Sequence, residues 1–163
     1  MNVLATQVGA ALKSHGLMLA TAESCTGGWV SQAVTSVAGS SAWFERGFIT
    51  YSNLSKQQML GVSEATLQQH GAVSEAAVRE MVTGALQHSA AQVALAVSGI
   101  AGPDGGTPDK PVGTVWFAWA IQHGAVHAEC HHFSGNRDEV RSHAVRTALH
   151  GVLEILDRHS QIA

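Results

Sequence analysis

The most informative segment of this chain is Thr21-Ala22-Glu23-Ser24-Cys25-Thr26-Gly27-Gly28. An apolar run from Leu17 to Ala20 precedes it and a helical pattern of apolar residues follows, so it predicts a strand, a tight turn and a helix start. A serine at such a turn projects its hydroxyl from the carboxyl edge of a sheet. We expect the amides of Thr26 to Gly28 to be free to hold an oxyanion. The alternative is that Ser24 only caps the helix, and this stretch alone favours neither interpretation.

The composition indicates one globular domain spanning residues 1–163 and excludes several classes of partner. The chain has 163 residues, 45% of them hydrophobic, which suits a single complete core. Nine basic residues against 12 acidic ones give a net charge of −3, so the chain lacks the basic excess of nucleic-acid-binding proteins. Two cysteines without ligand or disulfide spacing and no apolar run of spanning length predict a cytoplasmic protein that does not enter membranes.

Apolar periodicity places the remaining elements. Helical spacing predicts a first helix that ends at Gly16, and serines at N-cap positions predict helices after Ser63 and Ser74. Short apolar runs predict three further strands and one hairpin partner. Strands are expected at residues 44–51, 93–97, 112–121 and 125–133, helices at 54–60, 64–70 and after 74, and a helix of about 20 residues at the end of the chain.

Alternating strands and helices that close with a hairpin predict an α/β fold. We expect a three-layer α/β/α sandwich with a mixed five-stranded sheet, a C-terminal β-hairpin and a long final helix. Ligands of such sheets bind beyond the carboxyl ends of the strands. Three unusual segments follow predicted strand ends, and we expect them to form one site: the Ser24 turn, residues 51–56, and the glycine- and proline-rich loop 99–111.

The chemistry of these segments is that of a serine hydrolase. Serine needs a nearby base at neutral pH, and a lysine can serve as one only where burial keeps it neutral. We expect Ser24 to attack an amide or ester carbonyl while Lys56 takes the proton, directly or through the Tyr51 phenol. The alternatives are a surface role for Lys56 and simple strand packing for Tyr51.

Two other residue sets offer competing chemistry. Cys25 is a rival nucleophile, because a thiolate is intrinsically more reactive than a hydroxyl. His127, Glu129 and His131 alternate onto one strand face, where they could hold a metal ion, but a half-exposed strand shows the same pattern. We therefore predict no metal and no cofactor.

The quoted stretch and several later motifs closely resemble the CinA C-terminal domain family, and within it the stand-alone nicotinamide-nucleotide amidohydrolases. The resemblance spans about residues 1–156. Its other markers are Tyr51-Ser52-Asn53 with Lys56, Gly71-Ala72-Val73-Ser74, Ser98-Gly99-Ile100-Ala101-Gly102-Pro103, Lys110-Pro111-Val112-Gly113-Thr114-Val115 and Gly135-Asn136-Arg137.

The resemblance implies hydrolysis of the carboxamide of nicotinamide mononucleotide to nicotinic acid mononucleotide and ammonia. It puts the catalytic serine, tyrosine and lysine on Ser24, Tyr51 and Lys56. For a substrate with a phosphate and a pyridinium ring, we expect binding by backbone amides of glycine-rich loops and by arginines near the final helix start. The predicted substrate-binding residues are Thr26, Gly27, Gly28, Gly99, Gly102, Arg137 and Arg141.

A second class of function stays open, in which the chain binds a nucleotide or a protein partner without turnover. The presence of Ser24, Tyr51 and Lys56 favours the enzyme. Apolar surface near Trp29, Trp43 and the final helix further predicts a homodimer.

Overall fold

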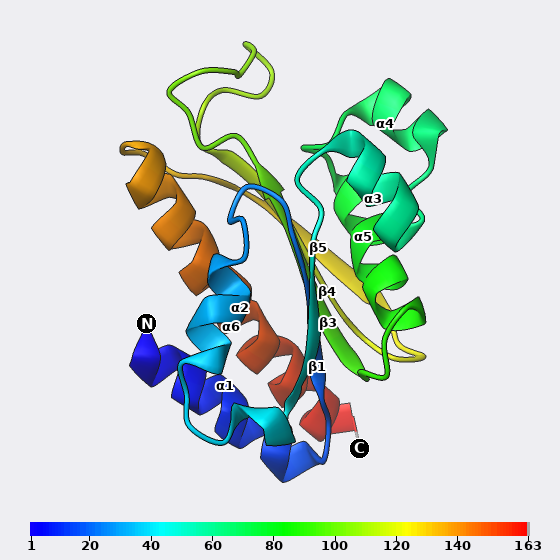
Figure 1. Ribbon diagram of the computed structural model, residues 1–163, viewed down its shortest axis with the longest axis vertical. Coiled ribbons are helices and arrows are strands. Elements are labelled where there is room, and N and C mark those ends of the chain that lie inside the picture. Colours follow the sequence, from blue (N-terminus) through cyan, green and yellow to red (C-terminus); the bar gives the residue numbers. More distant parts are fainter. Residues whose placement is uncertain (163) are drawn as a thin grey trace.

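The computed structural model describes residues 1–162, in which a five-stranded sheet lies between two layers of helices (Figure 1). The strand order is β2-β1-β3-β4-β5. The elements are α1 (Asn2–His15), β1 (Leu19–Glu23), α2 (Trp29–Thr35), η1 (Ser40–Ala42), β2 (Phe44–Ile49), α3 (Asn53–Leu60), α4 (Glu64–His70), α5 (Glu75–Gln87), β3 (Val93–Gly99), β4 (Thr114–Ile121), β5 (Val126–His132) and α6 (Arg137–Ile162).

The sheet is mixed, as the sequence predicts. Strand β1 runs parallel to β2 and β3, whereas β4 is antiparallel to β3 and forms the final hairpin with β5. Helices α1, α2 and α6 cover one face, and α3, α4 and α5 lie on the other side (Figure 1). Each layer buries its own apolar cluster against the sheet. The predicted three-layer α/β/α sandwich is therefore confirmed.

Local sequence signals set several helix boundaries. The hydroxyl oxygens of Ser63 and Ser74 accept hydrogen bonds from the amides of Thr66 and Ala77 at 3.0 and 3.2 Å, which caps α4 and α5. Helix α1 ends at Gly16, whose φ of 66° is left-handed and costs glycine little. These three predictions are confirmed.

Several boundaries differ from the sequence prediction. Strand β2 ends at Ile49 rather than at residue 51, so Tyr51 lies outside it, β3 continues to Gly99 rather than ending at 97, and β4 begins at Thr114 rather than at 112. Strand β1 begins at Leu19 rather than Leu17 and continues to Glu23, and all five of its residues are buried because β2 and β3 flank it. The final helix has 26 residues rather than about 20. Its last turns are polar and exposed, so they carry no apolar periodicity that a sequence pattern could detect.

Glycine sets the distance between two helices near the predicted site. A Cβ at Gly84 of α5 would lie 1.9 Å from the carbonyl oxygen of Leu60, the last residue of α3. No side chain fits at that separation. The absence of a side chain at Gly84 therefore allows α3, which carries Lys56, to pack directly on α5.

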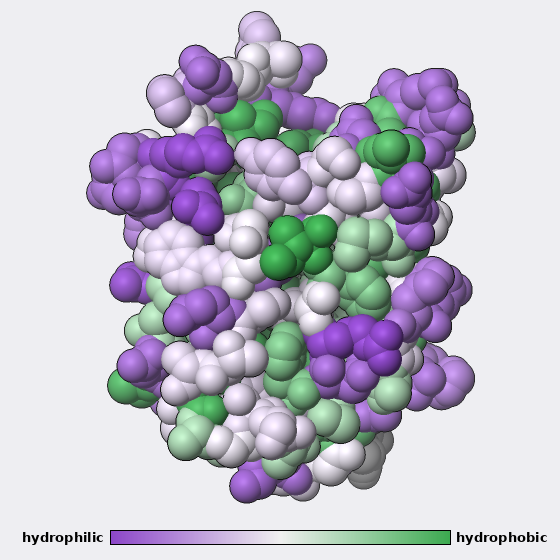
Figure 2. All heavy atoms as spheres, in the orientation of Figure 1, coloured by the Kyte–Doolittle hydropathy of each residue, from purple (hydrophilic) through white to green (hydrophobic). Residues whose placement is uncertain are grey.

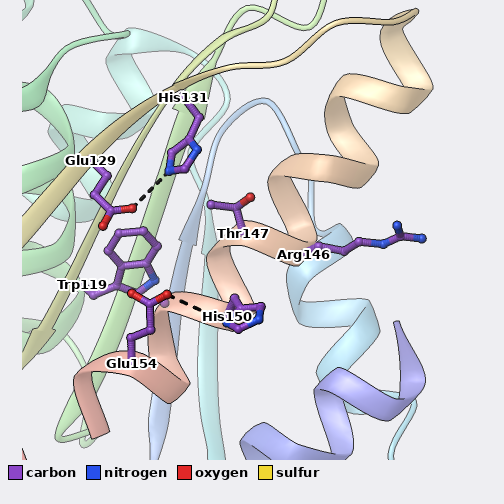
Figure 3. A pocket seen from close by; sticks show the side chains of 8 residues that line it. Trp119, Glu129, His131, Arg146, Thr147, His150 and Glu154 are labelled. Atoms are coloured by element: carbon purple, nitrogen blue, oxygen red, sulfur yellow. Dashed lines mark hydrogen bonds and ion pairs between the residues drawn. The ribbon is translucent and has the colours of Figure 1, made fainter. Parts of the chain in front are cut away.

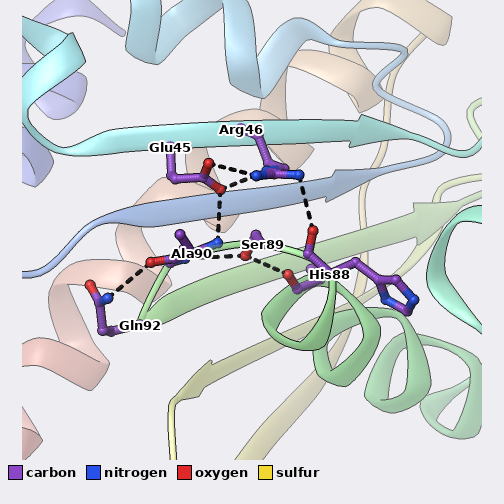
Figure 4. A network of polar contacts seen from close by, with 8 residues as sticks. Glu45, Arg46, His88, Ser89, Ala90 and Gln92 are labelled. Carbon is purple, nitrogen blue, oxygen red and sulfur yellow. Dashed lines mark hydrogen bonds and ion pairs between the residues drawn. The ribbon is translucent and has the colours of Figure 1, made fainter.

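Polar contacts hold the edge strand β2 in place (Figure 4). The guanidinium of Arg46 donates to the carboxylate of Glu45 at 2.7 and 2.9 Å and to the carbonyl oxygen of His88 at 3.1 Å. The same carboxylate accepts from the Ala90 amide at 3.2 Å, and its hydrogen bond with Arg46 lowers the pKa of Glu45. Since β2 pairs only with β1, these contacts tie its beginning to the chain between α5 and β3.

One residue predicted to lie at the surface is buried. Trp43, predicted to lie on an apolar surface, is 2% exposed and packs against Gly9 in the core. Figure 2 shows apolar residues near the centre of one face with polar ones around them. The large apolar side chains that are exposed are Val3, Ile49, Tyr51, Leu54, Met59 and Val112. Across residues 1–162, no helix combines the length and apolar character that a bilayer crossing needs.

Candidate active site

A pocket of about 260 Å³ opens at the carboxyl ends of β1 and β3. The three segments that the sequence singled out meet there, because parallel neighbouring strands end at the same edge of a sheet. In Figure 1 this edge lies at the top, below the long loop between β3 and β4. The lining residues are Ser24, Cys25, Tyr51, Asn53, Lys56, Ala72, Val73, Ser98, Gly99, Ala101 and Arg137.

The structure brings Ser24 and Lys56 into direct contact. Ser24 follows the last residue of β1, and its amide still donates to the carbonyl oxygen of Val97 in β3 at 3.0 Å. Lys56 lies one turn into α3 and its Nζ is 2.9 Å from Ser24 Oγ. The side chain of Lys56 is 1% exposed, so its interpretation as a surface lysine is wrong.

The surroundings of the Lys56 amine suit a neutral base. Its Nζ donates to the carbonyl oxygens of Thr50 and Tyr51 at 2.8 and 3.1 Å. A neutral amine has two N–H groups and one lone pair. In the ammonium form the third N–H donates to Ser24 Oγ; in the neutral form, with both N–H groups on carbonyls, the lone pair is left for the Ser24 hydroxyl. Burial lowers the pKa of Lys56 to about 8, and the nearby Cys25 opposes this only in part.

Cys25 lines the same pocket but is poorly suited to be the nucleophile. Its side chain is 7% exposed and belongs to the apolar cluster beneath the turn. Burial raises the pKa of the Cys25 thiol to about 11, so the thiol stays protonated near neutral pH. The geometry therefore favours Ser24 over Cys25.

Tyr51 reaches the pocket by two different groups. Its backbone carbonyl accepts from Lys56, as described above, whereas its side chain is 63% exposed. The phenol oxygen accepts a long hydrogen bond of 3.4 Å from Nη2 of Arg137. Within residues 1–162 no hydrogen bond joins the phenol to Ser24 or Lys56, so the geometry supports direct proton transfer rather than a relay through Tyr51.

The turn after Ser24 differs from the expectation of outward-pointing amides. The amide of Gly27 donates to the carbonyl oxygen of Ser24 at 3.1 Å, and the hydroxyl of Thr26 is buried and bound to Glu23. Gly27 and Gly28 have φ values of 57° and 102°, which suit the turn, but neither lines the pocket. Both glycines shape the backbone around Ser24, and of their two amides that of Gly27 is engaged within the turn.

The predicted phosphate-binding residues divide into two groups. Gly99 and Arg137 line the pocket, and Nη1 of Arg137 donates to the carbonyl oxygen of Gly102 at 2.8 Å. The guanidinium of Arg141 instead donates to the carbonyl oxygens of Cys25 and Thr26 at 3.0 and 3.2 Å. Arg141 also lies over the Trp29 ring at 5.4 Å, so it braces the turn from outside the pocket.

Sequence reasoning missed several residues of this site. Asn53 and Ser98 line the pocket, and both stand at element ends that the sequence analysis had marked without assigning them a role. The carbonyl of Thr50 orients the Lys56 amine, and no sequence signal reveals a backbone group. Glu23 is 0% exposed, and a charged residue at the end of a mainly apolar strand was a signal that could have been noticed.

A second polar pocket of about 250 Å³ lies between β5 and α6 (Figure 3). There the carboxylate of Glu129 contacts the imidazole nitrogens of His127 and His131, each at 3.1 Å. These contacts lower the pKa of Glu129, and the hydrogen bond with His131 has the larger effect. Across residues 1–162, no three or more His, Cys, Asp or Glu side chains are arranged to hold a metal ion. All three side chains are more than a third exposed.

The fold and the first pocket together define an α/β protein with a serine–lysine pair at the carboxyl edge of its sheet. The chain belongs to the CinA C-terminal domain family, whose model matches residues 1–156. It is 60% identical over 148 residues to nicotinamide-nucleotide amidohydrolase PncC of Escherichia coli strain K12, with 90% of this chain and 88% of that protein covered.

Other relatives agree with this assignment. The chain is 50% identical over 155 residues to nicotinamide-nucleotide amidohydrolase PncC of Pseudomonas putida, covering 95% of this chain and 96% of that protein. The crystal structure of the competence/damage inducible protein CihA from Agrobacterium tumefaciens matches with a TM-score of 0.91 at 45% identity. That match covers 96% of this chain and 94% of the other.

Proposed function

We propose that this chain hydrolyses the carboxamide of nicotinamide mononucleotide to nicotinic acid mononucleotide and ammonia. The observation that carries the proposal is the 2.9 Å contact between Ser24 Oγ and the buried Nζ of Lys56. High identity to relatives named nicotinamide-nucleotide amidohydrolase supports the substrate.

The first half of the reaction forms an acyl-enzyme. Neutral Lys56 takes the proton of the Ser24 hydroxyl as Oγ bonds to the amide carbon. No carbonyl oxygen of residues 1–162 accepts a hydrogen bond from the amide of Cys25, which directly follows the nucleophile. That amide can therefore stabilise the developing oxyanion. The Lys56 ammonium then gives its proton to the leaving nitrogen, the C–N bond breaks, and ammonia departs.

The second half releases the product and restores the enzyme. A water molecule attacks the acyl-enzyme carbonyl while neutral Lys56 takes one of its protons. The ester bond to Ser24 Oγ breaks, Lys56 returns the proton to that oxygen, and the carboxylic acid leaves. Lys56 thus acts as base and acid in turn, and a pKa of about 8 lies close to neutral pH, where both protonation states are accessible.

Substrate binding is assigned to Arg137, Tyr51 and the glycine-rich backbone beside the Ser24–Lys56 pair. Arg137 and the backbone near Gly99 and Gly102 would contact the phosphate, because a guanidinium and closely approaching amides both suit an anion. The exposed Tyr51 ring would lie against the cationic pyridinium. The amides of Thr26 and Gly28 stay in the proposal as oxyanion or phosphate donors, whereas the Gly27 amide and Arg141 are engaged with the turn itself.

The second candidate function is nucleotide or partner binding without turnover. The test is ammonia release from nicotinamide mononucleotide by the pure protein and by Ser24→Ala, with calorimetry of the same nucleotide. Release by the parent protein alone supports the amidohydrolase. Binding without release by either protein overturns it and supports the binding function.

We further propose that the protein forms a homodimer and that it is located in the cytoplasm. A homodimer would use the surface near Trp29 and α6, without Trp43, which is buried, and sedimentation velocity tests it. A cytoplasmic location is supported by two cysteines, Cys25 and Cys130, that form no disulfide.

A further inference from the structure

The carboxylate of Glu23 is a fully buried anion next to the nucleophile. Glu23 is the last residue of β1 and directly precedes Ser24, and it is 0% exposed. Its Oε1 accepts from the hydroxyl of Thr26 at 2.6 Å and from the amide of Val30 at 2.8 Å. Its Oε2 accepts from the amide and hydroxyl of Ser31 at 2.9 and 2.7 Å. Four donors thus offset the cost of burying the charge.

This carboxylate binds the start of α2, just beyond the Thr26 to Gly28 amides that the sequence predicted as anion donors. Val30 and Ser31 are the second and third residues of α2, whose amides have no partner within the helix. An anion at a helix N-terminus is favoured by the helix dipole and by these free N–H groups. In this protein the anion is an internal side chain, so α2 is fixed to the end of β1.

Glu23 also connects the nucleophile turn to the base. Its hydrogen bond with Thr26 crosses the turn that carries Ser24 and Cys25. Its backbone carbonyl accepts from the Thr50 amide at 2.8 Å, and the Thr50 carbonyl accepts from Lys56 Nζ at 2.8 Å. Glu23 is therefore linked to the Ser24 turn through Thr26 and to the Lys56 amine through Thr50.

We propose that the Glu23 carboxylate is a positioning residue, which holds the turn so that Ser24 Oγ and the Cys25 amide keep their reactive placement. This inference rests on the proposed function. A reacting oxygen displaced by about 1 Å can lose about two orders of magnitude in rate, so such a role affects turnover more than substrate affinity.

The chain contains a matched control for a purely structural role. The carboxylate of Glu80 accepts from the amide of Ser63 at 2.8 Å and from the hydroxyl of Thr66, so it also holds a helix start, that of α4. Neither Glu80 nor its partners line the pocket. If Glu23 only stabilised a helix, replacing either glutamate would lower the melting temperature and leave turnover of the folded protein unchanged.

The experiment compares Glu23→Gln with Glu80→Gln in steady-state ammonia release from nicotinamide mononucleotide, well below the melting temperature of each variant. Glutamine keeps the shape but directs an NH₂ group at one pair of donors. We expect kcat of Glu23→Gln to fall by at least about thirtyfold with KM within about threefold, and kcat of Glu80→Gln to stay within about twofold. Equal kcat in Glu23→Gln and the parent protein overturns the proposal.

A second pair of variants serves if Glu23→Gln does not fold. Thr26→Val removes only the hydroxyl that crosses the turn and leaves both α2 amides on the carboxylate. We expect it to lower kcat by about tenfold, and Thr26→Ser, which restores the hydroxyl, to recover most of that loss. Unchanged kcat in Thr26→Val contradicts the proposal.

A substrate-independent readout separates this inference from the proposed function. A fluorophosphonate probe bonds its phosphorus to Ser24 Oγ as the P–F bond breaks, with fluoride released and the hydroxyl proton passed to Lys56. Intact-mass spectrometry follows the rate of labelling. Slower labelling of Glu23→Gln and Thr26→Val than of Glu80→Gln supports positioning, even if the parent protein releases no ammonia and the proposed substrate is wrong. Equal labelling rates in all variants overturn the positioning role, whatever the substrate.

Discussion

The two polar pockets of this molecule are almost equal in size, at about 260 and 250 Å³, yet they place charged side chains in opposite ways. In the first pocket the Lys56 amine is 1% exposed and its hydrogen-bond partners leave one lone pair directed at Ser24. In the second, Glu129 and its two histidine partners are each more than a third exposed. Burial that shifts a pKa distinguishes the reactive cluster from the solvated one.

The largest expected effect is on Ser24. We expect Ser24→Ala to lower kcat/KM for nicotinamide mononucleotide by at least about a thousandfold, because within residues 1–162 Ser24 carries the only hydroxyl that is hydrogen-bonded to the Lys56 amine. Circular dichroism should show an unchanged fold. His131→Ala in the second pocket is the control. An equal loss of kcat/KM in Ser24→Ala and His131→Ala would remove the contrast between the pockets.

The next effect is on Lys56. Lys56→Met keeps the length of the side chain and removes the amine, so we expect a loss of about a hundredfold or more in kcat. Lys56→Arg should not recover it, since a guanidinium stays charged at every accessible pH. Substantial turnover by either variant would show that another group takes the proton from Ser24.

The pH dependence of turnover tests whether the buried Lys56 of the first pocket is the base. Burial lowers the pKa of Lys56 to about 8, and only the neutral amine accepts a proton. We therefore expect kcat/KM to rise about tenfold per pH unit below pH 8 and to level off above it. Rates measured in buffers from pH 6 to 9.5 test this. A profile that is flat between pH 6 and 8 would contradict Lys56 as the base.

The smallest effect is expected in the second pocket. Glu129→Gln removes the charge that the two histidines share, and we expect kcat within about twofold and a free energy of unfolding within about 1 kcal/mol of the parent, as for exposed ion pairs generally. Dialysis against a chelator should likewise leave ammonia release unchanged. A marked loss after either treatment would show that this face takes part in function.

Much of the fold could be predicted because its signals are local. Apolar runs mark the strands, and the N-caps at Ser63 and Ser74 follow from a preference of the free amides in the first helical turn. The end of α6 was missed because its last turns contact solvent and carry no pattern. Trp43 was misplaced because its burial depends on Gly9, which is distant in sequence.

Sequence patterns located the pocket-lining Ser24 and Lys56 but missed Asn53, Ser98 and the geometry that brings these residues together. Ser24 and Lys56 come from segments that follow strand ends, which sequence patterns locate. The depressed pKa of Lys56 depends on burial under other elements and on backbone carbonyls, which have no residue-type signature. The free amides expected in the Ser24 turn were misjudged in part, because the Gly27 amide donates within the turn itself, to the carbonyl oxygen of Ser24.

The bare backbone at Gly84 has a consequence for how this protein tolerates change. A methyl group there would meet the Leu60 carbonyl and wedge α3 away from α5, carrying the amine of Lys56 away from its hydroxyl partner. The spacing between proton donor and acceptor is thus governed by a residue without any reactive atom. A substitution at Gly84 would therefore be expected to abolish the proposed activity although every reactive side chain is still present.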